Sequence, residues 1–489
     1  MAVKFGKSPM FGGFGAPYRA EADIRDCEVD GEIPAAINGA FYRVGPDYQY
    51  PPLRPDNIPF DGEGHVSMFR IADGRADFRS RYVRTQRFKA QAAARRALFG
   101  MYRNPHTDDP AVKGVSRGTA NTHVVFHAGK LLALKEDSPP VLMDPDTLET
   151  LDDYHTFGGA LQSLTFTAHP KFDPGTGEML AFGYEARGEA TDDVAVYAID
   201  RSGRVTWEAW IKVPYVGMIH DFAVTQRHIA FLVIPMMTDV EQMKRGGVHY
   251  SWNTRLPTWF GVMRRGGDGS DLRWFKGPER CATHVMGAFS EGERVFVDMD
   301  MAHSNQFPFF PFTHGERYDR AKAEGYVTRV SVDLARPHTE VFDLEVLFPG
   351  AAGILPRQDD RCHTLPYRYG FMPTIDSTRP LDERIANAAT RPVNCWTRFD
   401  VIDRRTATFF VGDSESLQEC CFVPRSRDAP EGDGYLVGIA NVLLEGRSEL
   451  VIVDTQHMRE GAVARVRLPY RLNAGIHGWW VPGEHLKPF

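Results

Sequence analysis

Short runs of β-favouring residues, each ended by a Gly, Pro or Asp turn, fill most of the chain. Residues 121–157 give one example, in which NTHVVF, LLALKE, VLMDP and LDDYHTF are separated or bounded by HAGK, DSPP and DTLE. Such runs between turn-forming residues are typical of strands joined by tight connections. The pattern predicts a strand, turn, strand rhythm in an all-β fold.

The same rhythm recurs in seven units along the chain. They span residues 40–86, 121–157, 166–213, 220–277, 284–348, 363–412 and 419–471. Units of about 40 to 65 residues with roughly four strands each are typical of a β-propeller, whose sheets have short, protected edges. We therefore predict a seven-bladed β-propeller. Because no Ser/Gly linker or low-complexity tract divides the chain, we expect residues 1–489 to form a single propeller domain; two β-sandwich domains are the alternative.

Two stretches interrupt the rhythm and contain good helix formers. They lie within residues 86–104, QRFKAQAAARRALFGMYRN, and 303–325, where HGERYDRAKAEGY begins at residue 314. We predict inserted helices and loops that cap one face of the propeller and wall off a ligand cavity. The second stretch includes the aromatic run FPFFPF, in which Phe307 is a candidate substrate-binding residue. A structural plug under a loop is the alternative interpretation of this run.

Composition and charge exclude several other classes of protein. The chain has 45 Gly and 33 Pro among 489 residues, about 16% against an average of about 12%, so a helical bundle is not expected. Lys and Arg number 57 and Asp and Glu 64, and the resulting net charge of -7 is spread without blocks. A nucleic-acid partner is therefore not expected.

Neither a disulfide framework nor a membrane segment is indicated. The six cysteines include no CxxC pair, and the first residues contain no apolar run of signal-peptide length. The most apolar stretch, near IAFLVIPMM, is far shorter than the roughly 18 residues that a membrane helix needs. We expect a cytoplasmic protein without stable membrane insertion, and the sequence leaves open whether it forms a homodimer.

Histidine positions within the repeat point to a metal. His169, His220 and His284 lie at or near the start of a unit. His477 follows the seventh unit, where a chain that closes the ring would supply an innermost strand. Side chains at such positions converge on the propeller axis, and four neutral imidazoles at one point suit Fe(II), Zn, Cu or Ni. Iron is favoured because an octahedral site leaves positions open for dioxygen. His123 and His363 also begin units, so position alone leaves six candidates.

Longer motifs resemble those of the carotenoid cleavage oxygenase family. They are FDGEGHVSMFR at 60–70, HD at 220–221, PYRYG at 366–370, ECCFVPR at 419–425, EGDGYLVG at 431–438 and IHG at 476–478. The bacterial lignostilbene dioxygenases are most similar, through ALFGMYRNPHTDDP at 97–110, RGTANTHV at 117–124, HAGKLLALKEDSP at 127–139 and FPFFP at 307–311. The resemblance runs nearly end to end. It implies a seven-bladed propeller with an axial non-haem Fe(II) held by four histidines, which cleaves a carbon-carbon double bond with O2 into two carbonyl products.

The resemblance also selects among the candidate site residues. It assigns the metal to His169, His220, His284 and His477, and it leaves structural or pocket roles to His123 and His363. Glu136 and Glu419 match two of the three glutamates that orient ligand imidazoles in the family. The third glutamate belongs to a segment that here reads Gly353, Ile354, Leu355, Pro356, Arg357, so this chain departs from the pattern there.

Three further residues match lignostilbene-cleaving members: Phe60, Tyr102 and Lys135. An ammonium at Lys135 and the Tyr102 hydroxyl would favour the phenolate of a 4-hydroxystilbene and so enrich its alkene in electrons, while Phe60 stacks on a ring. The resemblance thus implies an Fe(II)-dependent dioxygenase, with O2 as co-substrate, that cleaves the central C=C bond of 4-hydroxystilbenes into two aromatic aldehydes. Cleavage of a carotenoid or apocarotenoid is the first alternative, and a propeller that binds partners without catalysis is the second.

Overall fold

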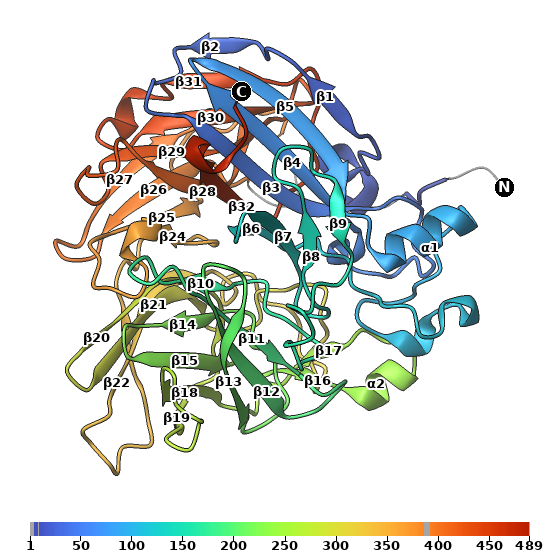
Figure 1. Ribbon diagram of the computed structural model, residues 1–489, viewed down its shortest axis with the longest axis vertical. Helices are drawn as coiled ribbons and strands as arrows, with labels where there is room; N and C mark the ends of the chain where they lie inside the picture. The colour runs from blue at the N-terminus through green and yellow to red at the C-terminus, as the bar shows by residue number, and fades with distance from the viewer. Residues whose placement is uncertain (1–3, 8, 386–391, 489) are drawn as a thin grey trace.

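The protein is a ring of antiparallel sheets around a common centre. The structure, a computed structural model, describes residues 4–7, 9–385 and 392–488. Within these residues, seven sheets of four or five strands follow one another around the ring (Figure 1). The predicted seven-bladed β-propeller is confirmed, and the alternative of two β-sandwich domains is wrong.

Blades 1 to 4 are built mainly from the first 277 residues. Blade 1 contains β32 (His477–Pro482), β3 (Gly39–Asp47), β4 (Glu63–Ala72), β5 (Arg75–Tyr82) and β1 (Ala22–Ile24). Blade 2 contains β6 (His123–His127), β7 (Lys130–Leu134), β8 (Val141–Met143) and β9 (Thr150–Asp152). Blade 3 contains β10 (Lys171–Phe172), β11 (Met179–Tyr184), β12 (Asp193–Ile199) and β13 (Val205–Lys212). Blade 4 contains β14 (Phe222–Val224), β15 (His228–Val233), β18 (Thr258–Arg264) and β19 (Arg273–Gly277).

Blades 5 to 7 complete the ring. Blade 5 contains β20 (Cys281–Glu291), β21 (Arg294–Ala302), β22 (Tyr326–Asp333) and β23 (Asp343–Val346). Blade 6 contains β24 (Arg357–Gln358), β25 (Tyr369–Thr374), β26 (Cys395–Asp400) and β27 (Arg405–Phe410), and so begins earlier than the predicted residue 363. Blade 7 contains β28 (Glu415–Pro424), β29 (Gly434–Val442), β30 (Arg447–Asp454), β31 (Ala464–Arg467) and β2 (Val29–Gly31).

The middle strands of the blades are apolar on both faces because neighbouring blades pack face to face. Every residue of β11, MLAFGY, and of β12, DVAVYAI, is buried. Turn chemistry sets the hairpins between such strands. After β12 the Asp200 carboxylate accepts hydrogen bonds from the backbone N–H of Ser202 and of Arg204, at 2.9 and 3.0 Å, and Gly203 supplies a φ of +85°. Buried runs between such turns are the rhythm visible in the sequence.

Both ends of the chain take part in closing the ring. The C-terminal β32 is the innermost strand of blade 1 and pairs with β3, with His477 opposite Val44. The N-terminal β1 and β2 are the outermost strands of blades 1 and 7, so the blue and red ends of the chain lie side by side in Figure 1. The prediction that the segment around His477 supplies an innermost strand is confirmed.

Insertions between strands differ in part from the predicted helices. The first stretch forms α1 (Gln86–Ala94), and the Thr85 side chain caps it by accepting a hydrogen bond from the N–H of Phe88 at 3.0 Å. The second prediction is wrong, because HGERYDRAKAEGY forms turns rather than a helix. This segment is largely exposed, so it has no apolar face to pack, and an isolated helix of this length is marginal in water.

Smaller elements complete the fold. Blade 4 carries an unpredicted insertion, a hairpin of β16 (Met236–Thr238) and β17 (Tyr250–Trp252) with α2 (Val240–Lys244) between its strands. Short 3-10 helices are η1 (Pro9–Phe11), η2 (Gly13–Gly15), η3 (Pro59–Asp61), η4 (Pro105–Thr107), η5 (Pro110–Val112), η6 (Asp360–Cys362), η7 (Met458–Glu460) and η8 (Gly483–His485). Within the described residues, no helix is both long and apolar enough to span a membrane.

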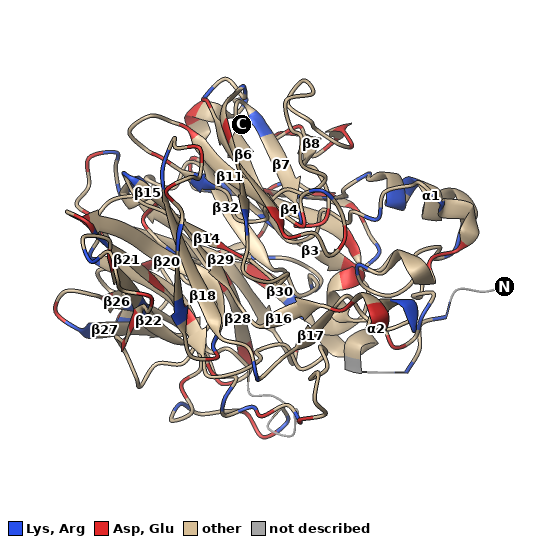
Figure 2. Ribbon diagram, turned by 90° about the horizontal axis from the view of Figure 1, so that it is seen from below, with Lys and Arg blue, Asp and Glu red and all other residues tan. Residues whose placement is uncertain are grey.

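Charged residues of both signs are interspersed over the loops and strand ends (Figure 2). This distribution agrees with the net charge of -7 without blocks along the sequence. All six cysteines are free thiols, and five of them are buried. The interior of the ring is therefore the place to look for a functional site.

Candidate metal centre and substrate cavity

Four histidines from four different blades meet at the centre of the ring. His169 and His220 lie in the connections that lead into β10 and β14, whereas His284 lies within β20 and His477 opens β32. One nitrogen of each ring can be chosen so that all four nitrogens lie within 4.8 Å of one another. The Nε2 atom of His220 is 3.2 Å from Nε2 of His169 and 3.2 Å from Nε2 of His284. The structure thus brings together the four histidines that the sequence analysis assigned to the metal.

Two buried glutamates orient two of these imidazoles. His220 Nδ1 donates a hydrogen bond to Glu136 at 2.5 Å, and His477 Nδ1 donates one to Glu419 at 2.8 Å. These bonds hold the proton on Nδ1, so that the lone pair of each Nε2 faces the centre. Burial opposes ionisation of Glu136, but the electrostatic attraction and hydrogen bond from the Nδ1–H of His220, with a smaller contribution from Arg103, outweigh it and lower the pKa of this carboxyl to about 2.

The imidazole of His284 has no such partner. Its Nδ1 is buried and makes no hydrogen bond to any described residue, and a carboxylate oxygen of Asp300 is 3.7 Å away. Asp300 is instead bonded to the backbone N–H of His284 at 2.6 Å and to the Thr283 hydroxyl at 2.8 Å. The resemblance implies a third glutamate in the segment that here contains Ile354. The apolar side chain of Ile354 cannot accept a hydrogen bond.

The chemistry of the four donors fits a divalent metal ion. Nε2 of His477 is buried and makes no hydrogen bond within the described residues, although three other imidazoles surround it. Burial, together with the charges of the neighbouring histidines, holds the pKa values of His169 and His477 well below the ordinary value. The imidazoles of His169 and His477 are therefore neutral near pH 7, as metal ligands must be. Burial also disfavours the charged form of His220, but Glu136 outweighs it and raises the pKa of that imidazole. An all-nitrogen set of donors suits iron, zinc, copper or nickel.

The other two candidate histidines lie outside the cluster. The ring of His123 is only 4.9 Å from that of His477, but its nitrogens face the backbone carbonyls of Ala168 at 2.8 Å and Gly478 at 3.4 Å. His363 lies 3.4 Å from a carboxylate oxygen of Asp360. Their positions agree with the structural or pocket roles that the resemblance left to them.

An apolar cavity of about 300 Å³ lies on one side of the cluster, and His220 and His284 form part of its wall. We call it the inner cavity. Phe60, Tyr102, Lys135 and Phe307, the four residues proposed from the sequence to bind or activate a substrate, all line it. They come from loops that lie far apart in the chain, since Phe60 precedes β4 and Phe307 follows β21. The structure therefore brings all of them to one space beside the four histidines.

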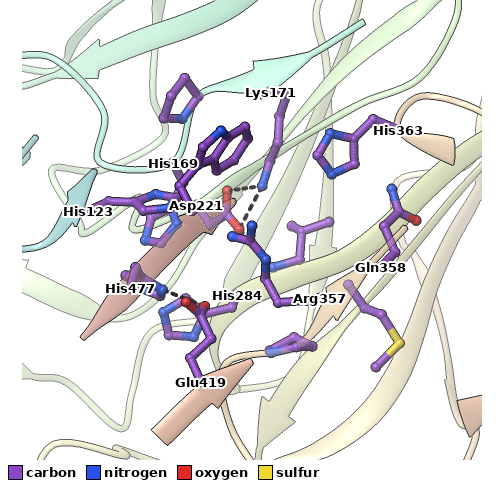
Figure 3. Close-up of a pocket in the computed structure, with 15 residues that line it drawn as sticks. His123, His169, Lys171, Asp221, His284, Arg357, Gln358, His363, Glu419 and His477 are labelled. Carbon is purple, nitrogen blue, oxygen red and sulfur yellow. Dashed lines mark hydrogen bonds and ion pairs between the residues drawn. The ribbon is translucent and has the colours of Figure 1, made fainter. Parts of the chain in front are cut away.

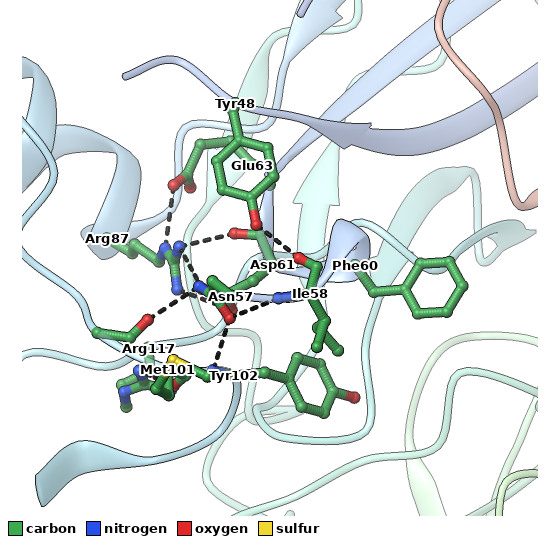
Figure 4. A network of polar contacts seen from close by, with 12 residues as sticks. Tyr48, Asn57, Ile58, Phe60, Asp61, Glu63, Arg87, Met101, Tyr102 and Arg117 are labelled. Atoms are coloured by element: carbon green, nitrogen blue, oxygen red, sulfur yellow. Dashed lines mark hydrogen bonds and ion pairs between the residues drawn. The ribbon is translucent and has the colours of Figure 1, made fainter. Parts of the chain in front are cut away.

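A buried polar network positions Phe60 and Tyr102 (Figure 4). The side-chain oxygen of Asn57 accepts hydrogen bonds from the N–H groups of Tyr102 at 3.0 Å and of Ile58 at 2.9 Å. Arg87 of α1 donates to Asp61 at 3.1 Å and to Glu63 at 3.0 Å. The two acids belong to the FDGEG motif, so ion pairs with α1 hold this motif, and with it Phe60, in place beside the inner cavity.

Lys135 lies deep in the inner cavity and is only 2% exposed. Its Nζ donates to the carbonyl oxygen of Phe60 at 3.1 Å and lies 3.4 Å from the side-chain oxygen of Asn121. The ammonium also lies 4.7 Å from the centre of the Tyr102 ring. Burial lowers the pKa of Lys135, and Asp137 and Asp61 offset only part of that effect. The predicted pair, Lys135 and Tyr102, is therefore in contact.

Comparisons with known proteins agree with this geometry. Residues 15–482 match the family described as retinal pigment epithelial membrane protein, RPE65. The chain belongs to this family, the carotenoid cleavage oxygenases. It is 41% identical over 473 residues to lignostilbene-alpha,beta-dioxygenase isozyme III of Sphingomonas paucimobilis, with 96% of each chain covered. It is 42% identical over 483 residues to isoeugenol monooxygenase of Pseudomonas putida, with 98% of this chain and 99% of that one covered.

A solved structure extends the likeness to the whole fold. The crystal structure of the lignostilbene dioxygenase of Pseudomonas brassicacearum superposes with a TM-score of 0.95 at 41% identity, over 99% of this chain and 100% of that one. This carotenoid cleavage oxygenase therefore has relatives of nearly equal length whose names include both stilbene and phenylpropene substrates. The family resemblance inferred from the sequence motifs is confirmed.

On the other side of the cluster, this carotenoid cleavage oxygenase has a small polar cavity of about 40 Å³ (Figure 3). Lys171 and Asp221 form an ion pair at 2.7 Å in its wall, and Arg357 lies 5.4 Å from the centre of the Trp479 ring. The cavity is too small and too polar for an aromatic substrate, so the two sides of the metal centre differ in chemistry. An organic substrate belongs in the inner cavity.

Sequence reasoning missed several residues that line the inner cavity. Thr283 and Ile476 directly precede two of the cluster histidines, and Gln306 directly precedes Phe307. Adjacency to a proposed site residue was the signal that could have found them. Met218 and Leu355 also line the cavity; Met218 stands two residues before His220, and Leu355 lies in the segment that departs from the family pattern.

We expect Glu136→Gln to weaken iron binding about 10-fold or more while the protein stays folded. The change keeps a hydrogen-bond acceptor for His220 but removes the negative charge that holds the proton on Nδ1, and loss of such partners typically costs 10- to 100-fold in metal affinity. Competition with a chelator would measure the affinity. Glu185→Gln is the matched control, because Glu185 also pairs with a buried histidine, His249, at 2.9 Å, but outside the cluster. Equal losses in both variants would contradict an orienting role for Glu136.

Proposed function

We propose that the protein is an Fe(II)-dependent dioxygenase that cleaves the central C=C bond of 4-hydroxystilbenes with O2 to give two aromatic aldehydes. One observation carries this proposal: a buried ammonium, Lys135, and the Tyr102 ring lie together in an apolar cavity whose wall includes two histidines of the metal site. The full-length likeness to a lignostilbene dioxygenase supports the same substrate class.

His169, His220, His284 and His477 would hold the iron, and Glu136 and Glu419 would orient two of them. Bound iron would supply the activation of dioxygen. The reaction is balanced without another reductant, because the alkene loses its C=C bond and each carbon receives one oxygen atom of O2. Side chains of the protein would bind the phenol, hold the two rings and exclude water.

The Lys135 end of the inner cavity would bind the phenol. A phenolate oxygen there would be stabilised by the Lys135 ammonium, and the Tyr102 hydroxyl would supply a further hydrogen bond. Because the phenolate is conjugated with the alkene in the para position, stabilising this form enriches the alkene in electrons where oxygen must add. Phe60 and Phe307 would hold the rings by aromatic contacts and exclude water.

The inner cavity favours a two-ring phenol over a carotenoid. Its volume of about 300 Å³ is at the lower end for ligand pockets and is small for a long polyene. A hydrocarbon chain would also leave the Lys135 ammonium buried without an anionic partner, which is costly.

The free, mostly buried cysteines fit a reducing compartment, and we place the enzyme in the cytoplasm.

A substrate panel tests the proposed function directly. Iron-loaded protein would be incubated in air with 4-hydroxystilbene, unsubstituted stilbene, isoeugenol and an apocarotenal, and aldehyde products would be separated by chromatography. We expect kcat/KM for 4-hydroxystilbene to exceed that for unsubstituted stilbene about 100-fold or more, a gain typical of a stabilised oxyanion. Isoeugenol shares the para-hydroxyl group and is expected to react more slowly, because it lacks the second ring.

Three results would contradict the proposal. Equal turnover of stilbene with and without the hydroxyl group would remove Lys135 and Tyr102 from the mechanism, and preferential cleavage of the apocarotenal would favour the carotenoid alternative. Protein that takes up no iron after supplementation and forms no aldehyde would instead support a non-catalytic propeller.

A further inference from the structure

A second hollow lies on the surface next to the inner cavity. It has a volume of about 540 Å³, and we call it the outer groove; its wall includes Tyr318, Arg320, Glu324, Tyr326, Ile354 and Ile375. Ile354 also lines the inner cavity, so the two spaces adjoin at this residue. Three of the ten large hydrophobic side chains that are exposed within the described part of the chain lie here: Tyr318 at 39%, Ile354 at 42% and Ile375 at 36%. The outer groove thus combines exposed apolar side chains with polar ones, a mixture that is common in ligand sites.

The outer groove lies across the propeller axis from Lys135. Lys135 follows β7 in blade 2, whereas Ile354 belongs to the connection from blade 5 to blade 6. In a ring of seven, blades 5 and 6 are the two most distant from blade 2. A stilbene whose phenol is held at Lys135 therefore extends past the histidine cluster and directs its second ring toward Ile354.

The boundary between the two spaces is held by the backbone. Ile354 donates its N–H to the carbonyl of Pro373 at 3.2 Å, and Gly353 donates its N–H to the carbonyl of Gly325 at 2.9 Å. Leu355 adopts a left-handed conformation with φ of +59°, which costs a leucine about 1 kcal/mol or more and places its side chain in the wall of the inner cavity. The groove is thus formed before any ligand binds.

A buried amide at this boundary has an unused donor. Gln306 lines the inner cavity, and its Oε1 lies 3.5 Å from the Thr283 hydroxyl. Its Nε2 is buried and has no hydrogen-bond partner among the residues that the structure describes. A Cβ atom added to Gly325, which lines the outer groove, would lie only 2.8 Å from that Nε2, so the amide reaches the edge of the groove. Because a buried unpaired donor is costly, a ligand oxygen at this point would be stabilised.

We propose that the outer groove is a second substrate subsite, which takes an arylmethyl group, such as benzyl, attached through an ether oxygen to the distal ring of a 4-hydroxystilbene. This inference rests on the proposed function. The ether oxygen would accept a hydrogen bond from Gln306 Nε2, and the added ring would pack against Ile354, Ile375 and Tyr318. The enzyme would then cleave aryl-ether stilbenes with three rings as well as two-ring stilbenes, releasing the extended aldehyde from the groove side.

The first test compares substrates that share the reacting alkene. We would measure kcat/KM for 4-hydroxy-4'-methoxystilbene and 4-hydroxy-4'-benzyloxystilbene with iron-loaded wild type, Ile375→Trp and Ile402→Trp. Ile375 lines the outer groove, whereas Ile402 is 66% exposed in the turn between β26 and β27 and lines neither space. We expect the benzyloxy substrate to stay within about fivefold of the methoxy substrate in wild type and in Ile402→Trp. In Ile375→Trp the benzyloxy-to-methoxy ratio should fall about 10-fold or more, because the indole fills the space for the third ring.

A second comparison tests the amide. Replacing the ether oxygen of the benzyloxy group by CH2 removes the acceptor and keeps the shape, so wild type should prefer the ether about 5- to 10-fold, as one hydrogen bond predicts. Gln306→Met should abolish this preference. A wild type that cleaves the methoxy substrate but rejects the benzyloxy one, or an Ile375→Trp variant with an unchanged ratio, would overturn the subsite.

Failure of the subsite and failure of the proposed function can be told apart. Binding of the benzyloxy substrate would be measured by calorimetry without oxygen, where no turnover interferes. If no stilbene is cleaved but wild type binds this compound at least about 10-fold more tightly than Ile375→Trp, the proposed function is wrong and the groove is still a binding site. Equal affinities would overturn the groove as well.

Discussion

His169→Ala is expected to abolish iron binding, lowering the iron content from about one ion per chain to less than about one tenth and removing alkene cleavage. The His169 ring is within 5.2 Å, centre to centre, of the three other rings of the cluster, so its loss opens one side of the site. Loss of a ligand should cost more than the 10- to 100-fold in affinity that is typical of losing a residue that only orients one. Iron would be measured by mass spectrometry on folded, gel-filtered protein.

His123→Ala is the matched control, because this imidazole is also buried and its ring is 5.6 Å from that of His169. We expect this variant to keep its iron. It leaves the carbonyl of Ala168 without its partner, which can cost about 1 to 3 kcal/mol in stability, so the melting temperature must be recorded beside the iron content. Iron loss from folded His123→Ala, with iron retained in His169→Ala, would show that the ligand assignment is wrong.

Lys135→Met is expected to lower kcat/KM for 4-hydroxystilbene about 100-fold or more while leaving the iron content unchanged. The substitution removes the ammonium proposed to stabilise the phenolate, and loss of one donor to a developing oxyanion typically costs 100- to 1000-fold. Turnover of unsubstituted stilbene, which has no phenol, should change little. Aldehyde formation would be followed for both substrates at saturating O2.

The same variant should differ little in stability from wild type, because removal of a buried charge offsets the loss of the hydrogen bond to the Phe60 carbonyl. Burial lowers the pKa of Lys135, which means that the folded state disfavours the charged form relative to the unfolded state. That cost is present at pH values below the unfolded pKa, near 10.5, and Met removes it at neutral pH. Lys130→Met, at the exposed start of the same strand β7, is the control and should leave kcat/KM unchanged. Full activity of Lys135→Met on 4-hydroxystilbene would exclude the lysine from the mechanism.

The order of strands could be predicted from the sequence because each hairpin is encoded locally. A turn such as the one at Asp200 and Gly203 is specified by neighbouring residues, and the buried runs beside it follow from blades packing face to face. The segment from residue 314 was misjudged for the opposite reason. Its residues favour a helix one by one, but a short helix forms only when an apolar face is covered, and that depends on distant parts of the fold.

The site was only partly visible in the sequence. Position in the repeat pointed to six histidines, and it could not separate His123 from His169, because the difference lies in whether the ring nitrogens face backbone carbonyls or one another. The contact between Lys135 and Tyr102 joins two loops that no local pattern relates. The boundary between the inner cavity and the outer groove, at Gln306 and Ile354, could not be predicted from the sequence. It exists only where the connection between blades 5 and 6 meets a loop of blade 5.

The pairing of β32 with β3 also has a consequence for how the protein is made. His477 follows His284, the third histidine of the cluster, by 193 residues (477 − 284) and lies on the strand that completes blade 1. During synthesis, the first three histidines of the cluster leave the ribosome well before the fourth. The metal site therefore becomes complete only when the last strand has joined the first blade, so iron bound at four ligands would stabilise the closed ring and not its open precursors.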